Sequence, residues 1–529
     1  MEKQIGKRRT FAIISHPDAG KTTLTEKFLL YGGAIQLAGQ VKAKGDSRRA
    51  KSDFMKLEKE RGISVSASAM SFPYNNFWIN LVDTPGHADF SEDTYRTITA
   101  VDSVVMVIDG AKGIESQTKK LFEVSRLREI PIITFCNKMD RESRDNFEII
   151  DEIQELLTID VTPASWPIGS GENFIGCYDL LNNRIELMDR SEKNIRSKSI
   201  KIDTLSDPQI SDYIPKNLLE LLVQEIEMVR GLLPEFNMEA FRTGNMTPIW
   251  FGSAINSFGV KELLNGITAL APQPSPRKAN PRIIEANETS VSGFVFKVQA
   301  NMDQKHRDRV AYVRLCSGHF KRGMKLKHIR SNKYLSISNP IMFMANDREL
   351  TEDAWAGDII GIPNHGLIRL GDSFSEGEKI QFTGLPTFAP ELLKTVISLD
   401  PMKAKHLEKA LLQFAEEGMS KMLKPLIGNK WIIGVVGELQ FDVLKSRIKE
   451  EYGLTVKFEP SQFTSARWLI GDANTIEQFA KDNRSQMATD HDQSPVYLIR
   501  IKWDIERVIR DYPSLTLAST KEMQHEEPS

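Results

Sequence analysis

The residues best suited to chemistry form the run SHPDAGKTT near the N-terminus of the 529-residue chain. An apolar run at residues 11–14 precedes it, and a helical pattern with an apolar face follows it. A strand, a glycine-bearing loop and a helix start, in this order, are the context of a phosphate-binding loop. Backbone N–H groups and the positive end of the helix dipole then hold the oxygens of a triphosphate. The residues predicted to bind it are Ser15, His16, Pro17, Asp18, Ala19, Gly20, Lys21, Thr22 and Thr23.

Lys21 and Thr22 have the most specific predicted roles in this loop. Lys21 supplies a positive charge for the β- and γ-phosphates, and the hydroxyl of Thr22 can ligate Mg²⁺. Ser15 stands where the usual G-x-x-x-x-G-K-[ST] pattern has its first glycine. An imperfect match by itself is also compatible with an ordinary helix start, so the prediction depends on the motifs that follow.

The second motif is DTPGH, which follows the apolar run at residues 78–82. Asp83, at the end of a predicted strand, is suited to hold Mg²⁺ through water, and Gly86 lets its N–H approach a γ-phosphate closely. His87 is then predicted to orient the attacking water. The predicted binding residues of this motif are Asp83, Thr84, Pro85, Gly86 and His87. The alternative is a Pro-Gly turn with a surface histidine.

Two further motifs predict that the base is guanine. Asn137, Lys138 and Asp140 follow a strand-like run that ends at residue 136. An amide and a carboxylate placed there can hydrogen-bond a purine edge, and Asp140 would accept from two guanine nitrogens, which adenine cannot match. Ser253 and Ala254 close a later run, where a backbone N–H is predicted to reach the guanine O6. Taken alone, each motif is compatible with a solvated turn.

Ser64 is predicted to be the second hydroxyl ligand of Mg²⁺. It ends the basic, unpatterned segment 40–64, and long segments of this kind are often functional loops. We expect this loop to become ordered only when a γ-phosphate is present. The alternative is a solvated loop whose serine has no role.

These motifs require a sheet that brings them together. Apolar runs at residues 11–14, 78–82, 103–108, 130–135 and 249–251 alternate with helical patterns. Such runs predict buried, mostly parallel strands, and ligands bind at the carboxyl ends of such strands. Residues 1–276 are therefore predicted to form an α/β P-loop GTPase domain with an insertion at about 166–247.

The second half of the chain carries no catalytic constellation. After a proline-punctuated linker, short alternating runs predict an antiparallel β-barrel at residues 277–388, with a charged loop at 299–309 that either contacts RNA phosphates or is a solvated hairpin tip. A split β-α-β pattern predicts an α+β ferredoxin-like C-terminal domain at 389–529. Its last residues, 519–529, are polar and predicted to be disordered.

The bulk composition agrees with a soluble globular protein of a reducing compartment. The three cysteines have no paired spacing, which favours neither disulfides nor a metal knuckle. No apolar run approaches about 18 residues, so we expect no membrane span and a cytoplasmic location. The formal net charge of −2 leaves any RNA contact to local basic patches.

With its motifs assembled, the sequence resembles the translational GTPases. The matching stretches are 18–23, 61–63, 83–87, 137–140 and 253–254, in order and spacing. In that family the histidine after DTPG positions the hydrolytic water, and serine is tolerated in place of the first glycine. Many relatives have threonine where this chain has Ser64, which keeps the hydroxyl.

Residues 166–178, 301–310 and 437–444 resemble more narrowly the class II release-factor GTPases of bacteria. The resemblance implies ribosome-stimulated hydrolysis of GTP to GDP and phosphate, with Mg²⁺ as cofactor. It also implies that the protein promotes dissociation of class I release factors from the ribosome after peptide release. The implied partners are rRNA and ribosomal proteins, with no membrane, and the implied state is a monomer.

Two alternatives remain open. An elongation factor G-like translocase or ribosome-rescue GTPase shares the motifs, but we expect further C-terminal domains in such a protein, whereas this chain ends about 70 residues past the ferredoxin-like unit. A nucleotide-sensing adaptor without turnover is the other alternative, and His87 together with the predicted magnesium ligands argues against it.

Overall fold

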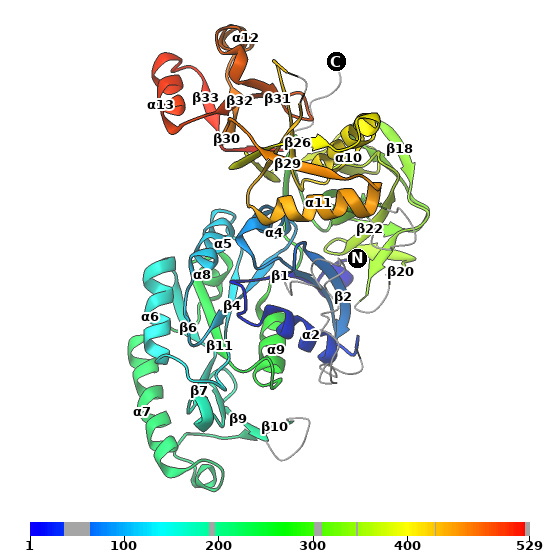
Figure 1. The fold of residues 1–529 in the computed structure, drawn as a ribbon. Coiled ribbons are helices and arrows are strands. Elements are labelled where there is room, and N and C mark those ends of the chain that lie inside the picture. The colour runs from blue at the N-terminus through cyan, green and yellow to red at the C-terminus, as the bar shows by residue number, and fades with distance from the viewer. Residues whose placement is uncertain (36–63, 190–195, 301–308, 345–347, 429, 524–529) are drawn as a thin grey trace.

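The structure is a computed structural model, which describes residues 1–35, 64–189, 196–300, 309–344, 348–428 and 430–523 (Figure 1). Most of the predicted loop 40–64 and most of the charged loop 299–309 lie outside the described residues. In the part of the chain that is described, no helix is both long enough and apolar enough to cross a membrane.

A seven-stranded sheet with the order β2-β3-β1-β4-β5-β11-β6 forms the centre of the N-terminal region. All neighbouring strands are parallel except β2 and β3, which pair antiparallel. The mostly parallel α/β sheet predicted from the apolar runs is thereby confirmed. The strands are β1 (Arg8–Ser15), β2 (Ser68–Tyr74), β3 (Phe77–Asp83), β4 (Ser103–Asp109), β5 (Ile132–Asn137), β6 (Asp160–Pro163) and β11 (Met246–Phe251).

Helices cover both faces of this sheet because its strands are apolar on both sides. In β1, Phe11 and Ile13 pack in one core cluster with α2 (Lys21–Tyr31) and α9 (Val260–Leu270). Ala12 and Ile14 point the other way, into a second cluster with residues of α4 (Ser91–Thr99), α5 (Ser116–Leu127) and α6 (Asn146–Leu157). This alternation buries β1 on both faces, and its parallel pairing with β3 brings the carboxyl ends of the two strands side by side.

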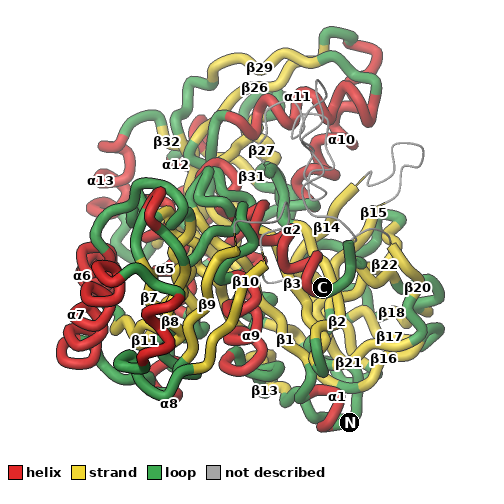
Figure 2. Tube along the Cα trace, turned by 90° about the horizontal axis from the view of Figure 1, so that it is seen from below, coloured by secondary structure: helices red, strands yellow, loops and turns green. Residues whose placement is uncertain are grey.

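A smaller unit interrupts the chain between β6 and β11. It contains an antiparallel sheet of β7 (Ser165–Ile168), β8 (Gly176–Asp179), β9 (Arg184–Asp189) and β10 (Arg196–Lys201), followed by α7 (Lys216–Leu232) and α8 (Met238–Arg242). Both views place α6 and α7 on the side of the molecule opposite to β18, β20 and β22 of the next region (Figures 1 and 2).

An eight-stranded antiparallel sheet with the order β18-β17-β23-β14-β15-β22-β19-β20 follows, where the barrel was predicted. Its strands enclose a core that includes Val295, Phe320 and Phe374. The strands are β14 (Ser292–Ala300), β15 (Arg309–Ser317), β17 (Lys325–His328), β18 (Lys333–Ser336), β19 (Ile341–Phe343), β20 (Arg348–Leu350), β22 (Ile359–Asn364) and β23 (Ser373–Ser375).

The C-terminal region has the predicted split β-α-β order. Its elements are β26 (Leu392–Ser398), α10 (Ala404–Glu416), β27 (Lys421–Pro425), β28 (Ile432–Val435), α11 (Leu439–Tyr452) and β29 (Val456–Pro460), with the sheet order β29-β26-β28-β27. The same sheet continues into β31-β32-β30-β33. These strands are β30 (Ser465–Ile470), β31 (Met487–Thr489), β32 (Pro495–Ile499) and β33 (Thr516–Ala518), with α12 (Ala473–Asp482) and α13 (Lys502–Asp511) between them.

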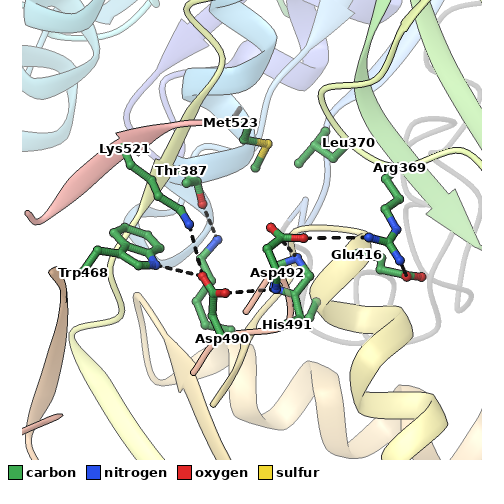
Figure 3. A pocket seen from close by; sticks show the side chains of 12 residues that line it. Arg369, Leu370, Thr387, Glu416, Trp468, Asp490, His491, Asp492, Lys521 and Met523 are labelled. Carbon is green, nitrogen blue, oxygen red and sulfur yellow. Dashed lines mark hydrogen bonds and ion pairs between the residues drawn. The ribbon is translucent and has the colours of Figure 1, made fainter. Parts of the chain in front are cut away.

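The prediction of disorder from residue 519 onward was wrong for residues 519–523. Strand β34 (Thr520–Glu522) pairs antiparallel with β25 (Pro386–Phe388), a segment that connects the second and third regions. Lys521 Nζ lies 3.2 Å from Asp490 Oδ2, and both residues line a small cavity of about 30 Å³ (Figure 3). A polar sequence is therefore ordered by pairing with a distant strand.

Helix α4, which follows the DTPGH motif, is held by the C-terminal region. Buried Glu92 accepts hydrogen bonds from Lys421 Nζ at 3.0 Å and from Thr387 Oγ1 at 3.3 Å, and it also pairs with Arg96. Burial favours the neutral acid, but Arg96 and Lys421 hold the pKa of Glu92 below its ordinary value. The ionised carboxylate of Glu92 therefore stabilises this packing at neutral pH. The stabilisation is lost as the pH falls through the lowered pKa of Glu92.

Candidate functional site

The predicted phosphate-binding loop connects β1 to α2 and lines a cavity of about 260 Å³. Gly20 is the N-cap of α2 and has a φ of 98°, in the left-handed region. A Cβ at this position would lie 2.2 Å from Asn137 Nδ2, so both the backbone and the close approach require glycine. The cavity is lined by Ser15, His16, Pro17, Asp18, Gly20, Lys21, Thr22, Thr23, Ser64, Gly86 and His87.

Replacing Gly20 by alanine is expected to weaken binding of GTP and GDP by at least about tenfold, because left-handed backbone costs a Cβ-bearing residue about 1–2 kcal/mol and Asn137 must also move. Binding of a fluorescent guanine nucleotide measures this loss. Gly33→Ala is the matched control, because Gly33 has a φ of 68° but no atom within 4 Å of an added Cβ. Equal losses in both variants would show that the contact with Asn137 has no role.

Lys21 and Asp83 meet at the carboxyl ends of β1 and β3. Lys21 Nζ lies 2.6 Å from Asp83 Oδ1, and both side chains are buried. Among the described residues, the other carboxylate oxygen, Asp83 Oδ2, is buried without a hydrogen-bond partner. The predicted phosphate-binding cation and the predicted magnesium carboxylate are therefore neighbours.

The rest of the DTPGH motif is fixed against the first strand and the phosphate-binding loop. Thr84 Oγ1 donates a hydrogen bond to the carbonyl of Ile13 at 2.6 Å, and the carbonyl of Pro85 accepts one from Thr94 Oγ1 at 3.3 Å. An added Cβ on Gly86 would be 3.6 Å from the backbone of Pro17, so the two loops are in contact range.

His87 reaches the same cavity with about a third of its side chain exposed. Its Nδ1 accepts a hydrogen bond from the backbone N–H of Asp89 at 3.2 Å, which leaves Nε2 as the ring nitrogen free of this contact. The second histidine of the cavity, His16, is buried, and neither ring nitrogen has a hydrogen-bond partner among the described residues. Burial lowers the pKa of His16, so its ring is neutral at pH 7.

Asn137 connects two of the predicted loops. Its Nδ2 donates to the carbonyl of Ala19 at 2.7 Å, and its Oδ1 accepts from the backbone N–H of Ala254 at 2.8 Å. The N–H of Ser253 donates to the carbonyl of Phe258 at 3.0 Å. The prediction was that a backbone N–H of this pair reaches guanine O6. Both N–H groups are already paired in the structure, so such a contact requires Ala254 to share or release its bond to Asn137.

Asp140 and Lys138 lie in the loop after β5. Lys138 Nζ is 2.6 Å from Asp109 Oδ2, and although burial favours the neutral acid, this hydrogen bond keeps the pKa of Asp109 below its ordinary value. Asp140 Oδ1 is buried and has no hydrogen-bond partner among the described residues. An acceptor left in this state fits the predicted role of receiving N–H groups from a base.

The structure brings Ser64 and Thr22, which lie 42 positions apart in the sequence, to one cavity. The remainder of that predicted loop, including residues 60–63, lies outside the described residues. Sequence reasoning missed Asp109. This residue ends strand β4 in the same way as Asp83 ends β3, and its place at a strand end could have indicated it.

Comparison with known proteins identifies three domains in succession. Residues 6–273 match the family model of the elongation factor Tu GTP binding domain. Residues 290–377 match elongation factor G domain 2, and residues 382–509 match the C-terminal domain of class II release factor RF3.

The fold is also similar to that of a solved protein from Thermus thermophilus. The two chains are 21% identical, with a TM-score of 0.70 over 87% of this chain and 68% of the other. At this identity the likeness shows the shared fold alone.

Proposed function

Because the chain belongs to the translational GTPases, with an elongation factor Tu GTP binding domain and a class II release factor RF3 C-terminal domain, we propose that it acts in translation termination. In this proposal it binds the ribosome and uses GTP to drive class I release factors off after they have freed the peptide. The match of residues 382–509 carries the proposal, because the other two matches are shared with elongation factors. It disfavours the elongation factor G-like translocase and the rescue GTPase.

In this proposal, each polar group of the nucleotide site binds a particular part of GTP or Mg²⁺. Lys21 and the N–H groups before α2 bind the phosphates, and Asp140 Oδ1 accepts from the guanine. The donor set fits Mg²⁺, which prefers oxygen ligands, since Asp83 Oδ2 is a buried acceptor without a partner among the described residues. Thr22, Ser64 and, through water, Asp83 would hold this ion, which would neutralise charge on the β- and γ-phosphates.

Hydrolysis in this proposal depends on positioning rather than covalent chemistry. His87 orients the attacking water, and ribosome docking brings the histidine into its active position, so that hydrolysis away from the ribosome is slow. The γ-phosphate holds the segments around Ser64 and Gly86, and its loss releases them. Helix α4 follows the Gly86 segment and contacts the C-terminal region through Glu92. Loss of the γ-phosphate therefore alters how the C-terminal region is held.

The proposal is tested with ribosomes that carry a labelled class I release factor after peptide release. Adding this protein with GTP is expected to accelerate departure of the label, and GDP is expected not to. A non-hydrolysable GTP analogue is expected to release the label while this protein itself stays bound. Unchanged departure with GTP would contradict the proposal, and movement of tRNA instead would establish a translocase. Monomeric state and cytoplasmic location stay predictions.

A further inference from the structure

Asp89 contacts both the segment of His87 and the C-terminal region. It lies in the short helix η1 (Ala88–Phe90), where its backbone N–H donates to His87 Nδ1 at 3.2 Å and its Oδ1 lies 3.4 Å from the same nitrogen. Its other oxygen, Oδ2, accepts a hydrogen bond of 2.8 Å from the backbone N–H of Leu439, the first residue of α11. One residue therefore contacts the predicted catalytic histidine through its backbone N–H and, through its carboxylate, a helix 350 residues away in sequence.

Gly437, two residues before α11, leaves room for the side chain of Asp89. A Cβ on Gly437 would lie 2.0 Å from Asp89 Cγ and 2.4 Å from its Cβ. The backbone of Gly437 is not in the left-handed region, so its conformation does not require glycine. Glycine is needed here because a side chain would overlap Asp89. A negative charge at the first turn of a helix is also favoured by the helix dipole.

An apolar contact supports the same junction. Phe90, next to Asp89, forms a buried cluster with Val443 of α11 and with Val65, which follows the predicted magnesium ligand Ser64. Leu439 packs against this cluster. Displacement of α11 relative to the nucleotide domain must therefore act on the segments that follow Ser64 and His87, two residues that line the cavity.

We propose that Asp89 is a positioning residue, through which the C-terminal domain sets the orientation of the His87 ring for hydrolysis. The inference rests on the proposed function, because it assigns to Asp89 an effect exerted through His87. The hydrogen bond to Leu439 fixes the carboxylate of Asp89 and thereby the backbone of η1, whose Asp89 N–H donates to Nδ1 of the histidine and leaves Nε2 for the attacking water. Binding of the C-terminal domain to the ribosome then reaches the reacting water without contacting the nucleotide.

The first test is Asp89→Ala in the full-length protein, assayed by single-turnover GTP hydrolysis at saturating ribosomes. Misplacement of a reacting group by about 1 Å costs about 100-fold, and a loss of that order is expected, with GTP affinity and the ribosome concentration for half-maximal rate unchanged. Asp89→Asn is expected to retain much of the activity, because its amide oxygen still accepts from Leu439. Asp145→Ala is the matched control, since Asp145 caps α6 by accepting from Phe147 at 2.9 Å.

A double substitution shows whether Asp89 acts through His87. In a His87→Ala background, Asp89→Ala is expected to lower the rate no further, whereas an additive loss would overturn the inference. A normal rate for Asp89→Ala beside an impaired His87→Ala would also overturn it while leaving the proposed function intact. If His87→Ala itself turned over GTP normally, both the inference and the catalytic role of His87 would be lost.

The second test approaches the contact from the C-terminal domain. Gly437→Ala is expected to reproduce the loss in ribosome-stimulated hydrolysis without weakening GTP binding, because its methyl group displaces Asp89. Asp89→Gly removes the overlapping atoms, so Gly437→Ala is expected to have little further effect in that background. Equal effects of Gly437→Ala in both backgrounds would contradict a direct contact. Circular dichroism and thermal unfolding show that each variant is folded.

Discussion

Replacing His87 by alanine is expected to leave GTP and GDP binding intact and to lower ribosome-stimulated hydrolysis by about 10²- to 10⁴-fold. The side chain lines the cavity beside Lys21 and Thr22, but its only hydrogen-bonding contact among the described residues is with Asp89. Its removal is therefore expected to take away a group near the predicted γ-phosphate position without disturbing the predicted phosphate-binding loop. Phosphate release after rapid mixing with ribosomes measures the rate, and a fluorescent nucleotide measures the affinity.

His365→Ala is the control for this experiment, because His365 is exposed and follows β22 in the barrel region. It is expected to hydrolyse GTP at the rate of the unaltered protein. His87→Gln separates water orientation from proton transfer, since glutamine can still hydrogen-bond a water molecule. Turnover by His87→Ala at the full ribosome-stimulated rate would remove His87 from the mechanism, whereas absence of phosphate release by the unaltered protein would favour the adaptor without turnover.

The sequence predicted the mostly parallel sheet because its strands are buried on both faces and therefore read as continuous apolar runs. The run at residues 11–14 lies inside β1, and the run at 103–108 lies inside β4. Strand β2 escaped prediction, since its sequence SAMSFPY contains two serines and a proline. It is ordered by antiparallel pairing with β3 at the sheet edge, where tertiary context outweighs intrinsic preference.

Contacts between distant segments could not be predicted from local pattern. Glu92 and Lys421 are 329 residues apart, and nothing in either neighbourhood specifies the other as its partner. Asn137 is an instructive intermediate case. Its position after a strand identified it as part of the site, but only the folded chain shows its amide bridging Ala19 and Ala254. Motifs thus locate a site, whereas the contacts that each residue makes within it depend on how the folded chain packs.

We predict that Asp140 recognises the base, and Asp140→Asn is expected to change the preference from guanine to xanthine. Guanine presents two N–H donors to the carboxylate, and an amide would turn one acceptor into a donor that faces another donor. The loss is about 2–4 kcal/mol, or roughly 30- to 1,000-fold weaker GTP binding. Xanthine has a carbonyl in place of the exocyclic amine and suits the amide. Competition between GTP and XTP measures the change.

The structure makes this expectation sharper than the motif alone. The N–H groups of Ser253 and Ala254 already donate to Phe258 and Asn137. Asp140 Oδ1 has no hydrogen-bond partner among the described residues, so it can bind a base without rearrangement. Asp145→Asn, in the same loop region, is the control and should leave GTP preference unchanged. If Asp140→Asn still preferred GTP strongly over XTP, Asp140 would not be the group that recognises the exocyclic amine of guanine, and its predicted role would be lost.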